Sequence, residues 1–216
     1  MSPQCARAYT RLAAFHAYSV FAHGASVEQA TQMARSLAER ALDLDPTDPA
    51  VQATVAEAYI LVGEHDLARS HIEKAIKLNP NEYIVMHFAG LVLGYLGNHE
   101  AGLRWLHKMS RHDPFSGDAL REKVFDIFYM ARRYEDAIEA FQGWRNPPSH
   151  MYAELAAAYA QLDRMDDAQV AMANSERTRP PGFDPVQVAH AHARMCARRE
   201  DVDHWLEGYR KAGLKA

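Results

Sequence analysis

Residues 50–80 read AVQATVAEAYILVGEHDLARSHIEKAIKLNP and contain a complete helix-turn-helix pattern. In the second half, Ala68, Ile72 and Ala75 follow at steps of four and three residues, which places them on one face of a helix. Gly63 precedes this helix at a point where the chain must turn, and glycine adopts positive φ without steric cost. The stretch therefore predicts two amphipathic helices that pack together through small side chains.

The same pattern recurs with a period close to 34 residues. The prolines that end each segment are separated by 34, 34, 34 and 33 residues, at Pro46, Pro80, Pro114, Pro148 and Pro181. The small residues at the expected helix crossing keep the same period, at Ala34, Ala68, Gly102, Ala137 and Ala168. Apolar residues mark the first helix of successive units in matching places: Ala56 and Tyr59, Gly90 and Leu93, Val124 and Ile127, Ala156 and Tyr159. A period of this length is typical of stacked helix pairs.

Later units are less regular than the second and third. Gly63 and Gly97 occupy the turns of those two units, whereas Arg132 and Asp163 fall at the equivalent turns further along. In the fourth unit, Lys123 stands where neighbouring units have an apolar residue, which leaves the register of this unit open by one residue.

The repeat resembles the tetratricopeptide repeat, a helix-turn-helix unit of 34 residues with small residues at the helix crossing and a proline at the boundary. The resemblance covers about residues 6–181. It implies an all-α, right-handed superhelix of about six antiparallel helix pairs. We expect five pairs in residues 1–182, the first of them extended, and a divergent pair in residues 183–216 that caps the array. The five units fall at roughly 5–48, 49–82, 83–116, 117–148 and 149–182.

Three short sequences resemble a particular group of tetratricopeptide repeat regions. They are AERALDLDP at residues 38–46, IKLNPN at residues 76–81 and GYRKAGL at residues 208–214. These resemble the repeat region found C-terminal to bacterial class III adenylate cyclases and winged-helix regulators. The resemblance implies a regulatory module that is joined to an output domain. No cyclase or winged-helix segment is present in these residues, so no catalytic residue is carried over.

A ligand of such an array is expected on the concave side, which the first helices of the pairs line. Apolar or polar residues on these helices that lie off the packing stripe predict a groove for a peptide or protein segment. The predicted groove residues are Glu57, Leu61, His87, Leu91, Tyr95, Arg121, Phe125, Phe128 and Tyr129. The alternative is that the aromatic residues pack between adjacent units as core. The Lys and Asn pattern that some tetratricopeptide domains use to clamp a C-terminal carboxylate is not matched, so the acidic tails of heat-shock chaperones are not expected partners.

Composition limits the class of partner. The net charge of −4 and the pI near 6.3 provide no overall basic field, so a nucleic acid is not expected, and RNA binding by helical repeats would need basic groove positions. Residues 83–97 form the most apolar stretch and are too short to span a membrane. The start of the chain lacks a signal-peptide pattern, and Cys5 and Cys196 lie near opposite ends, which predicts a reducing, cytoplasmic environment.

Reactive groups do not assemble into a catalytic motif. His190, His192 and Cys196 are the best local metal cluster, but only the last two share a helical face and no second ligand group follows. A metal-dependent hydrolase is therefore an enzyme alternative without a ligand set, and no metal, cofactor or catalysis is expected. The main hypothesis is a protein-interaction module that binds a peptide in the groove, with possible self-association. A regulatory module that binds a small molecule in the same groove is the alternative.

Overall fold

The computed structural model describes residues 3–23, 26–112, 117–145, 147–181 and 183–215. Within these ranges the chain forms twelve α-helices and no strand. The helices are α1 (Pro3–His23), α2 (Val27–Leu44), α3 (Pro49–Leu61), α4 (His65–Leu78), α5 (Tyr83–Tyr95), α6 (His99–His112), α7 (Gly117–Met130), α8 (Tyr134–Phe141), α9 (Ser149–Gln161), α10 (Met165–Thr178), α11 (Pro185–Met195) and α12 (Arg199–Lys211).

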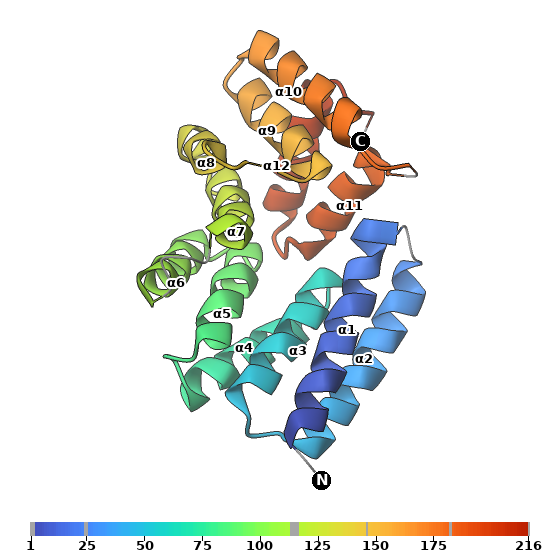
Figure 1. Cartoon of the computed structure of the whole chain (residues 1–216), viewed down its shortest axis with the longest axis vertical. Coiled ribbons are helices and arrows are strands. Elements are labelled where there is room, and N and C mark those ends of the chain that lie inside the picture. The colour runs from blue at the N-terminus through green and yellow to red at the C-terminus, as the bar shows by residue number, and fades with distance from the viewer. Residues whose placement is uncertain (1–2, 24–25, 113–116, 146, 182, 216) are drawn as a thin grey trace.

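Consecutive helices pack as six pairs, from α1 with α2 to α11 with α12 (Figure 1). The first helices of neighbouring pairs also contact one another, α1 with α3, α3 with α5 and α5 with α7. The prediction of an all-α array of about six helix pairs is confirmed over the described residues. Pro114, one of the prolines that mark the period, lies outside them.

Small residues bring the paired helices together where the sequence pattern places them. Ala34, Ala68, Ala137 and Ala168 are fully buried. Gly102 replaces alanine in the third pair, because a Cβ at this position would lie 2.8 Å from the backbone oxygen of Gly90 on the neighbouring helix. The period of the small residues therefore reflects the closest approach of two backbones in each pair.

Positive φ occurs at all four described turns between the paired helices of units two to five. Gly63 and Gly97 have φ of 84° and 87°, and Arg132 and Asp163 have φ of 61° and 57°. The two later turns therefore keep the left-handed conformation, although a non-glycine residue is strained there by about 1 kcal/mol or more. The side chain of Arg132 has a structural use that offsets this strain, as described below.

The last helix pair contacts helices from both halves of the array. α12 packs against α9 and contacts α7, whereas α11 reaches back to contact α1 and α3 (Figure 1). The pair thus crosses the concave side and brings α11 against α1, the first helix of the chain. The regular period could not predict this position, because the contacts of α11 with α1 and α3 join residues more than one hundred positions apart and those of α12 with α7 and α9 skip over neighbouring pairs.

Backbone contacts hold this crossing in place. The amide of Ala197 donates to the carbonyl oxygen of Tyr95 at 2.9 Å, and the Nε2 atom of His65 lies 3.1 Å from the carbonyl oxygen of Arg194. A Cβ on Gly63 would lie 2.9 Å from the Cγ atom of Arg194. The early turns therefore need glycine for two reasons, the positive φ and the approach of the C-terminal segment.

A buried carboxylate anchors α12 to the array. Asp201 accepts hydrogen bonds from Arg132 at 2.6 Å and from the Nε atom of Arg198 at 2.7 Å, and lies 3.3 Å from His99. Burial alone would raise the pKa of Asp201, but the hydrogen bonds from these three residues hold it well below its usual range. The ionised carboxylate thus joins three separate parts of the chain.

Candidate functional site

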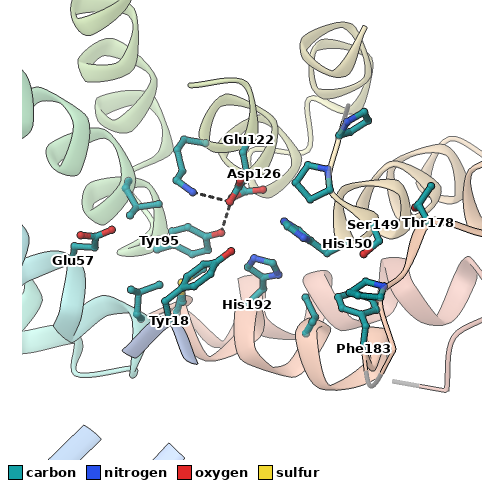
Figure 2. Close-up of a pocket in the computed structure, with 18 residues that line it drawn as sticks. Tyr18, Glu57, Tyr95, Glu122, Asp126, Ser149, His150, Thr178, Phe183 and His192 are labelled. Atoms are coloured by element: carbon teal, nitrogen blue, oxygen red, sulfur yellow. Dashed lines mark hydrogen bonds and ion pairs between the residues drawn. The ribbon is translucent and has the colours of Figure 1, made fainter. Parts of the chain in front are cut away.

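A chamber of about 480 Å³ lies where α11 crosses the first helices of the pairs (Figure 2). α11 forms one wall, and side chains from α1, α3, α5, α7 and α9 form the others. The residues that line it are Tyr18, Glu57, Leu61, Leu91, Tyr95, Glu122, Lys123, Asp126, Pro147, Pro148, Ser149, His150, Thr178, Pro180, Phe183, Val188, His192 and Met195. The folded-back C-terminal pair has therefore turned an open concave surface into a partly enclosed site.

Asp126 is the most buried acid that lines the chamber, with 1% of its surface exposed. It comes from the inner face of α7, and its Oδ2 atom accepts a hydrogen bond from the Tyr95 hydroxyl at 2.9 Å (Figure 2). Its carboxyl group also shares a hydrogen bond with Glu154, and no cationic side chain of the described residues is hydrogen-bonded to it. Burial raises the pKa of Asp126 to about 7, although the ammonium of Lys123 acts in the opposite direction.

Glu154 on α9 lies beside Asp126 just outside the lining of the chamber. Burial raises its pKa well above the usual range, and the neighbouring charge of Asp126 adds to this rise. Two adjacent carboxylates that share a low-dielectric environment cannot both ionise at low cost, so the pair retains a proton. The described residues thus offer Asp126 a shared proton in place of a paired cation.

Glu57 contributes a second buried carboxyl group, from α3. Its Oε2 atom is inaccessible to solvent and has no hydrogen-bond partner among the described residues. Burial raises the pKa of Glu57 to about 7, and the more distant charges of Lys123 and Arg11 only partly oppose this. In the view of Figure 2, Tyr95 lies between Glu57 and Asp126.

Lys123 is neutralised by its neighbour in the chain. Its Nζ atom lies 2.7 Å from a carboxylate oxygen of Glu122. Burial would raise the pKa of Glu122, but the Lys123 charge and hydrogen bond, together with nearby histidines, lower it to about 2. The pKa of Lys123 is raised by the facing carboxylates despite burial. The two residues therefore form a closed ion pair at neutral pH.

The histidines near the chamber are neutral at physiological pH. Burial lowers the pKa of His192 to about 3 and that of His87 to about 4, and it also lowers the pKa of His150. The Nδ1 atom of His192 lies 3.4 Å from a carboxyl oxygen of Glu154. The ring nitrogens can therefore exchange hydrogen bonds with a ligand but do not supply positive charge.

Four of the nine predicted groove residues line the chamber, namely Glu57, Leu61, Leu91 and Tyr95. His87 lies on the same helix, α5, and its ring packs edge-on against Phe88 with centroids 4.9 Å apart. The prediction thus included the α3 and α5 walls of the chamber.

The other four predicted residues, all on α7, lie away from it. Phe125 and Tyr129 are fully buried and stack on each other, and Tyr129 also packs against Trp205 of α12. Arg121 donates to the carbonyl oxygens of Ala140 and Gln142, and Phe128 lies beneath the guanidinium of Arg133. In this structure the α7 aromatics pack in the manner of the core alternative.

Several lining residues were not predicted, and the repeat register held a signal for two of them. Asp126 stands where other units have Ala58 and Val92, and Lys123 stands where they have Val55. These correspondences follow the 34-residue count, and both charges line the chamber. The turn residues Gly97 and Arg132 are 35 positions apart, however, so the end of α7 is shifted by one residue, and Asp126 corresponds in the structure to Glu57 and Leu91. Tyr18, His150 and His192 line the chamber through contacts between distant units, which no local pattern reports.

The described residues hold no group of three or more His, Cys, Asp or Glu side chains that could bind a metal ion. His192 faces Glu154, whereas the Sγ atom of Cys196 lies 3.7 Å from the Sδ atom of Met130. Across the same ranges, no helix combines the length and apolar character needed to span a membrane.

Comparison with known proteins supports the assignment of the fold. A family model of the tetratricopeptide repeat matches residues 28–86. A thermophilic TPR protein of Thermus thermophilus is 19% identical, with a TM-score of 0.63 over 84% of this chain and 98% of that chain. The pilF protein of Pseudomonas aeruginosa is 17% identical, with a TM-score of 0.58 over 95% of this chain and 90% of that chain.

A third solved structure, MamA AMB-1, is 20% identical, with a TM-score of 0.56 over 79% of this chain and 96% of that chain. A search of curated proteins found no match. The repeat period, the paired helices and these likenesses lead to one assignment: residues 28–86 match the tetratricopeptide repeat family, and the described residues have the fold of a tetratricopeptide repeat array.

Proposed function

We propose that this protein is an interaction module that binds a short segment of a partner protein at the mouth of the chamber, with part of the segment inserted. The observation that carries the proposal is the chamber itself, a concavity of about 480 Å³ on the side where helical-repeat proteins bind their ligands. Protein-interaction modules are common among tetratricopeptide repeat proteins, which supports this class of function.

The C-terminal pair decides the size of the proposed ligand. Because α11 contacts both α1 and α3, it occupies part of the surface on which a long helix would lie across several units. The remaining volume suits a few side chains or the end of a peptide. Tyr18, Thr178 and Phe183 line the mouth region, and the first two are exposed, so they are available to contact the rest of the segment.

A second candidate is a regulatory module that binds a small molecule in the same chamber. The observation that favours it is the convergence of buried ionisable groups, which typically fix the orientation of a small ligand in a largely apolar pocket. The resemblance to repeat regions of bacterial regulators agrees with this candidate. A cytoplasmic location is part of both proposals and is supported by the buried, free thiol of Cys196.

A random peptide library displayed on phage tests the main proposal. The library is selected on the wild-type protein, and the enriched peptides are then measured against Thr178→Trp, which narrows the mouth of the chamber. Val170→Trp is the matched control, because Val170 lies on the same helix with 64% of its surface exposed and away from the chamber. Circular dichroism checks that each variant folds.

We expect enriched peptides to bind the wild type and Val170→Trp equally and to lose at least tenfold in affinity for Thr178→Trp. Peptides that bind all three proteins equally would place the interaction elsewhere on the surface and contradict the proposal. Failure to enrich any peptide would also contradict it and would favour the small-molecule candidate.

A further inference from the structure

We propose that the chamber binds an organic cation, an alkylammonium or guanidinium group, beside Tyr95 in the part of the chamber that Asp126 and Glu57 line. The inference rests on the proposed function and specifies the chemistry of the inserted group. Two buried acidic groups carry it: Glu57, whose Oε2 atom has no hydrogen-bond partner among the described residues, and Asp126, whose partners Tyr95 and Glu154 supply no positive charge. Both residues line the same cavity, and Asp126 is almost completely inaccessible to solvent.

The balance of charge in the chamber selects the sign of the ligand. The described lining residues include three carboxyl groups, those of Glu57, Glu122 and Asp126, and one ammonium group, that of Lys123. Glu122 already pairs with Lys123 at 2.7 Å. The lining therefore supplies no separate cation for Glu57 and Asp126. A bound positive charge would form ion pairs with these two acids.

Neighbouring titratable groups do not fill this role. His150 and His192 face the chamber from α9 and α11, and His87 lies beside it on α5, but burial keeps all three rings neutral near pH 7. The Tyr95 hydroxyl donates a hydrogen bond to Asp126 but carries no charge, and Glu154 is a further acid that supplies no positive charge. Arg11 on α1 is exposed and acts on Glu57 only at a distance.

The walls suit the apolar stem of an alkyl cation. Leu61, Leu91 and Val188 provide aliphatic surface, and the rings of Tyr95 and Phe183 also line the cavity. Aromatic faces attract ammonium and guanidinium groups through the electrostatic field of the ring. An anionic ligand would instead meet two unpaired acids, because the one lysine is already neutralised.

An alkylammonium or guanidinium group has two natural sources, a free amine or the Lys or Arg side chain of the partner segment. The chemistry at Asp126 and Glu57 is the same for both. They differ in what lies outside the chamber, because a peptide also contacts the mouth near Tyr18 and Thr178.

Four probes of equal length test the inference by isothermal titration calorimetry at pH 7.5: n-butylamine, n-butylguanidine, butyric acid and n-butanol. Two short acetylated and amidated peptides, one with a central lysine and one with norleucine in its place, form the second arm. The proteins are the wild type, Asp126→Asn and Glu57→Gln, with Asp203→Asn as the matched control because that side chain is 64% exposed on α12.

We expect the two cations to bind the wild type and Asp203→Asn with equal affinity. Each chamber variant should lose about tenfold or more in affinity for them, because it lacks one hydrogen-bonded negative charge. Tighter binding of the lysine peptide than of butylamine assigns the cation to a partner segment. Binding of butylamine alone assigns it to a free amine.

Equal binding of butanol, or unchanged cation binding by Asp126→Asn and Glu57→Gln when both fold normally, would overturn the inference. Lack of binding by both cations and by the lysine peptide would overturn it as well. This failure is distinct from failure of the proposed function, because the displayed library can still enrich peptides without basic residues that depend on the chamber mouth.

Discussion

Asp201 of α12 and Arg132 of the turn after α7 are joined by a contact of 2.6 Å, although they lie 69 positions apart in the sequence. The contact explains why an arginine occupies a turn where earlier units have glycine. Its positive φ of 61° is retained because the guanidinium holds the folded-back C-terminal pair against the array. The same contact therefore fixes the wall of the chamber that α11 provides.

Asp201→Asn is expected to destabilise the docked C-terminal pair. The substitution leaves Arg132 and Arg198 without a buried negative partner, and breaking such a pair costs about 3 kcal/mol. The folded-state pKa of Asp201 is depressed, so its contribution is present above the unfolded pKa, which is about 3.9, and is lost as pH falls through the folded pKa.

Urea unfolding at several pH values measures this effect. The difference in the free energy of unfolding between wild type and Asp201→Asn should be largest above pH 5 and should become smaller at lower pH. A difference that is absent at pH 7 would mean that Asp201 does not anchor α12. Asp203→Asn, on the exposed side of the same helix, is the control and should change stability little.

Gly208→Ala is expected to destabilise the protein even though alanine favours helices. Gly208 lies inside α12, where a Cβ would overlap the hydroxyl oxygen of Tyr129 and lie 3.3 Å from the Cβ of Ala157. Overpacking typically destabilises a protein by about 1–3 kcal/mol. The replacement of glycine by alanine inside a helix stabilises it by about 1 kcal/mol, so the net loss is smaller than the overpacking cost. Thermal unfolding of Gly208→Ala, Tyr129→Phe and the double variant measures the coupling.

Removal of the Tyr129 hydroxyl should reduce the effect of Gly208→Ala. Additive effects in the double variant would show that α12 does not pack on Tyr129 at this point. A higher melting temperature for Gly208→Ala than for the wild type would lead to the same conclusion.

Glu57→Gln is expected to stabilise the unliganded protein above pH 7 and to have little effect near pH 4.5. Burial raises the pKa of Glu57 to about 7, so the folded state retains a proton that the unfolded state has lost. Stability therefore falls as pH rises from about 4.3 to about 7, and then stays constant with respect to this group. We expect a gain on the order of 2 kcal/mol at pH 8. Equal stability of both proteins at pH 8 would contradict the burial of an unpaired acid.

Affinity for a cation should increase with pH over the range in which Glu57 and Asp126 ionise. Both have a pKa of about 7, whereas Glu122 is ionised throughout and His192 is neutral throughout. Titration of butylamine at pH 6 and pH 8 should therefore give tighter binding at pH 8, by about threefold to tenfold. Weaker binding at pH 8 would indicate that the carboxylates are not the binding groups.

Phe125→Ala and Phe128→Ala are expected to differ although both residues lie on α7. Phe125 is fully buried against Phe141 and Tyr129, so its truncation should cost about 3–5 kcal/mol. Phe128 is half-buried beneath Arg133, so Phe128→Ala should lower the free energy of unfolding by clearly less. Chemical denaturation of each variant compares them, and equal, small losses would favour the predicted exposed groove over the core position.

The fold was predictable because each repeat contacts mainly its neighbours. Spacings such as Ala68, Ile72 and Ala75 report local packing directly, and the prolines report the ends of the units. The crossing by α11 and α12 was not predictable in the same way. It depends on contacts such as Arg132 with Asp201, which join distant units and leave no periodic signal.

The candidate site was predictable only in part for the same reason. Glu57, Leu91 and Tyr95 were identified from their place on the first helices, and all three line the chamber. The α7 face was the harder case, because one helix presents Phe125 to the core and Asp126 to the chamber. Only the neighbouring helices decide which of these adjacent residues is available to a ligand.

The most direct test of the account is photo-crosslinking with a selected peptide whose basic residue is replaced by a diazirine-bearing lysine analogue. Tandem mass spectrometry then identifies the residue to which the analogue attaches. The account predicts attachment to chamber residues such as Leu91, Pro148 or Val188, and loss of the product in Asp126→Asn. Attachment to the outer faces of α4, α6 or α10, with the same yield in Asp126→Asn, would contradict it.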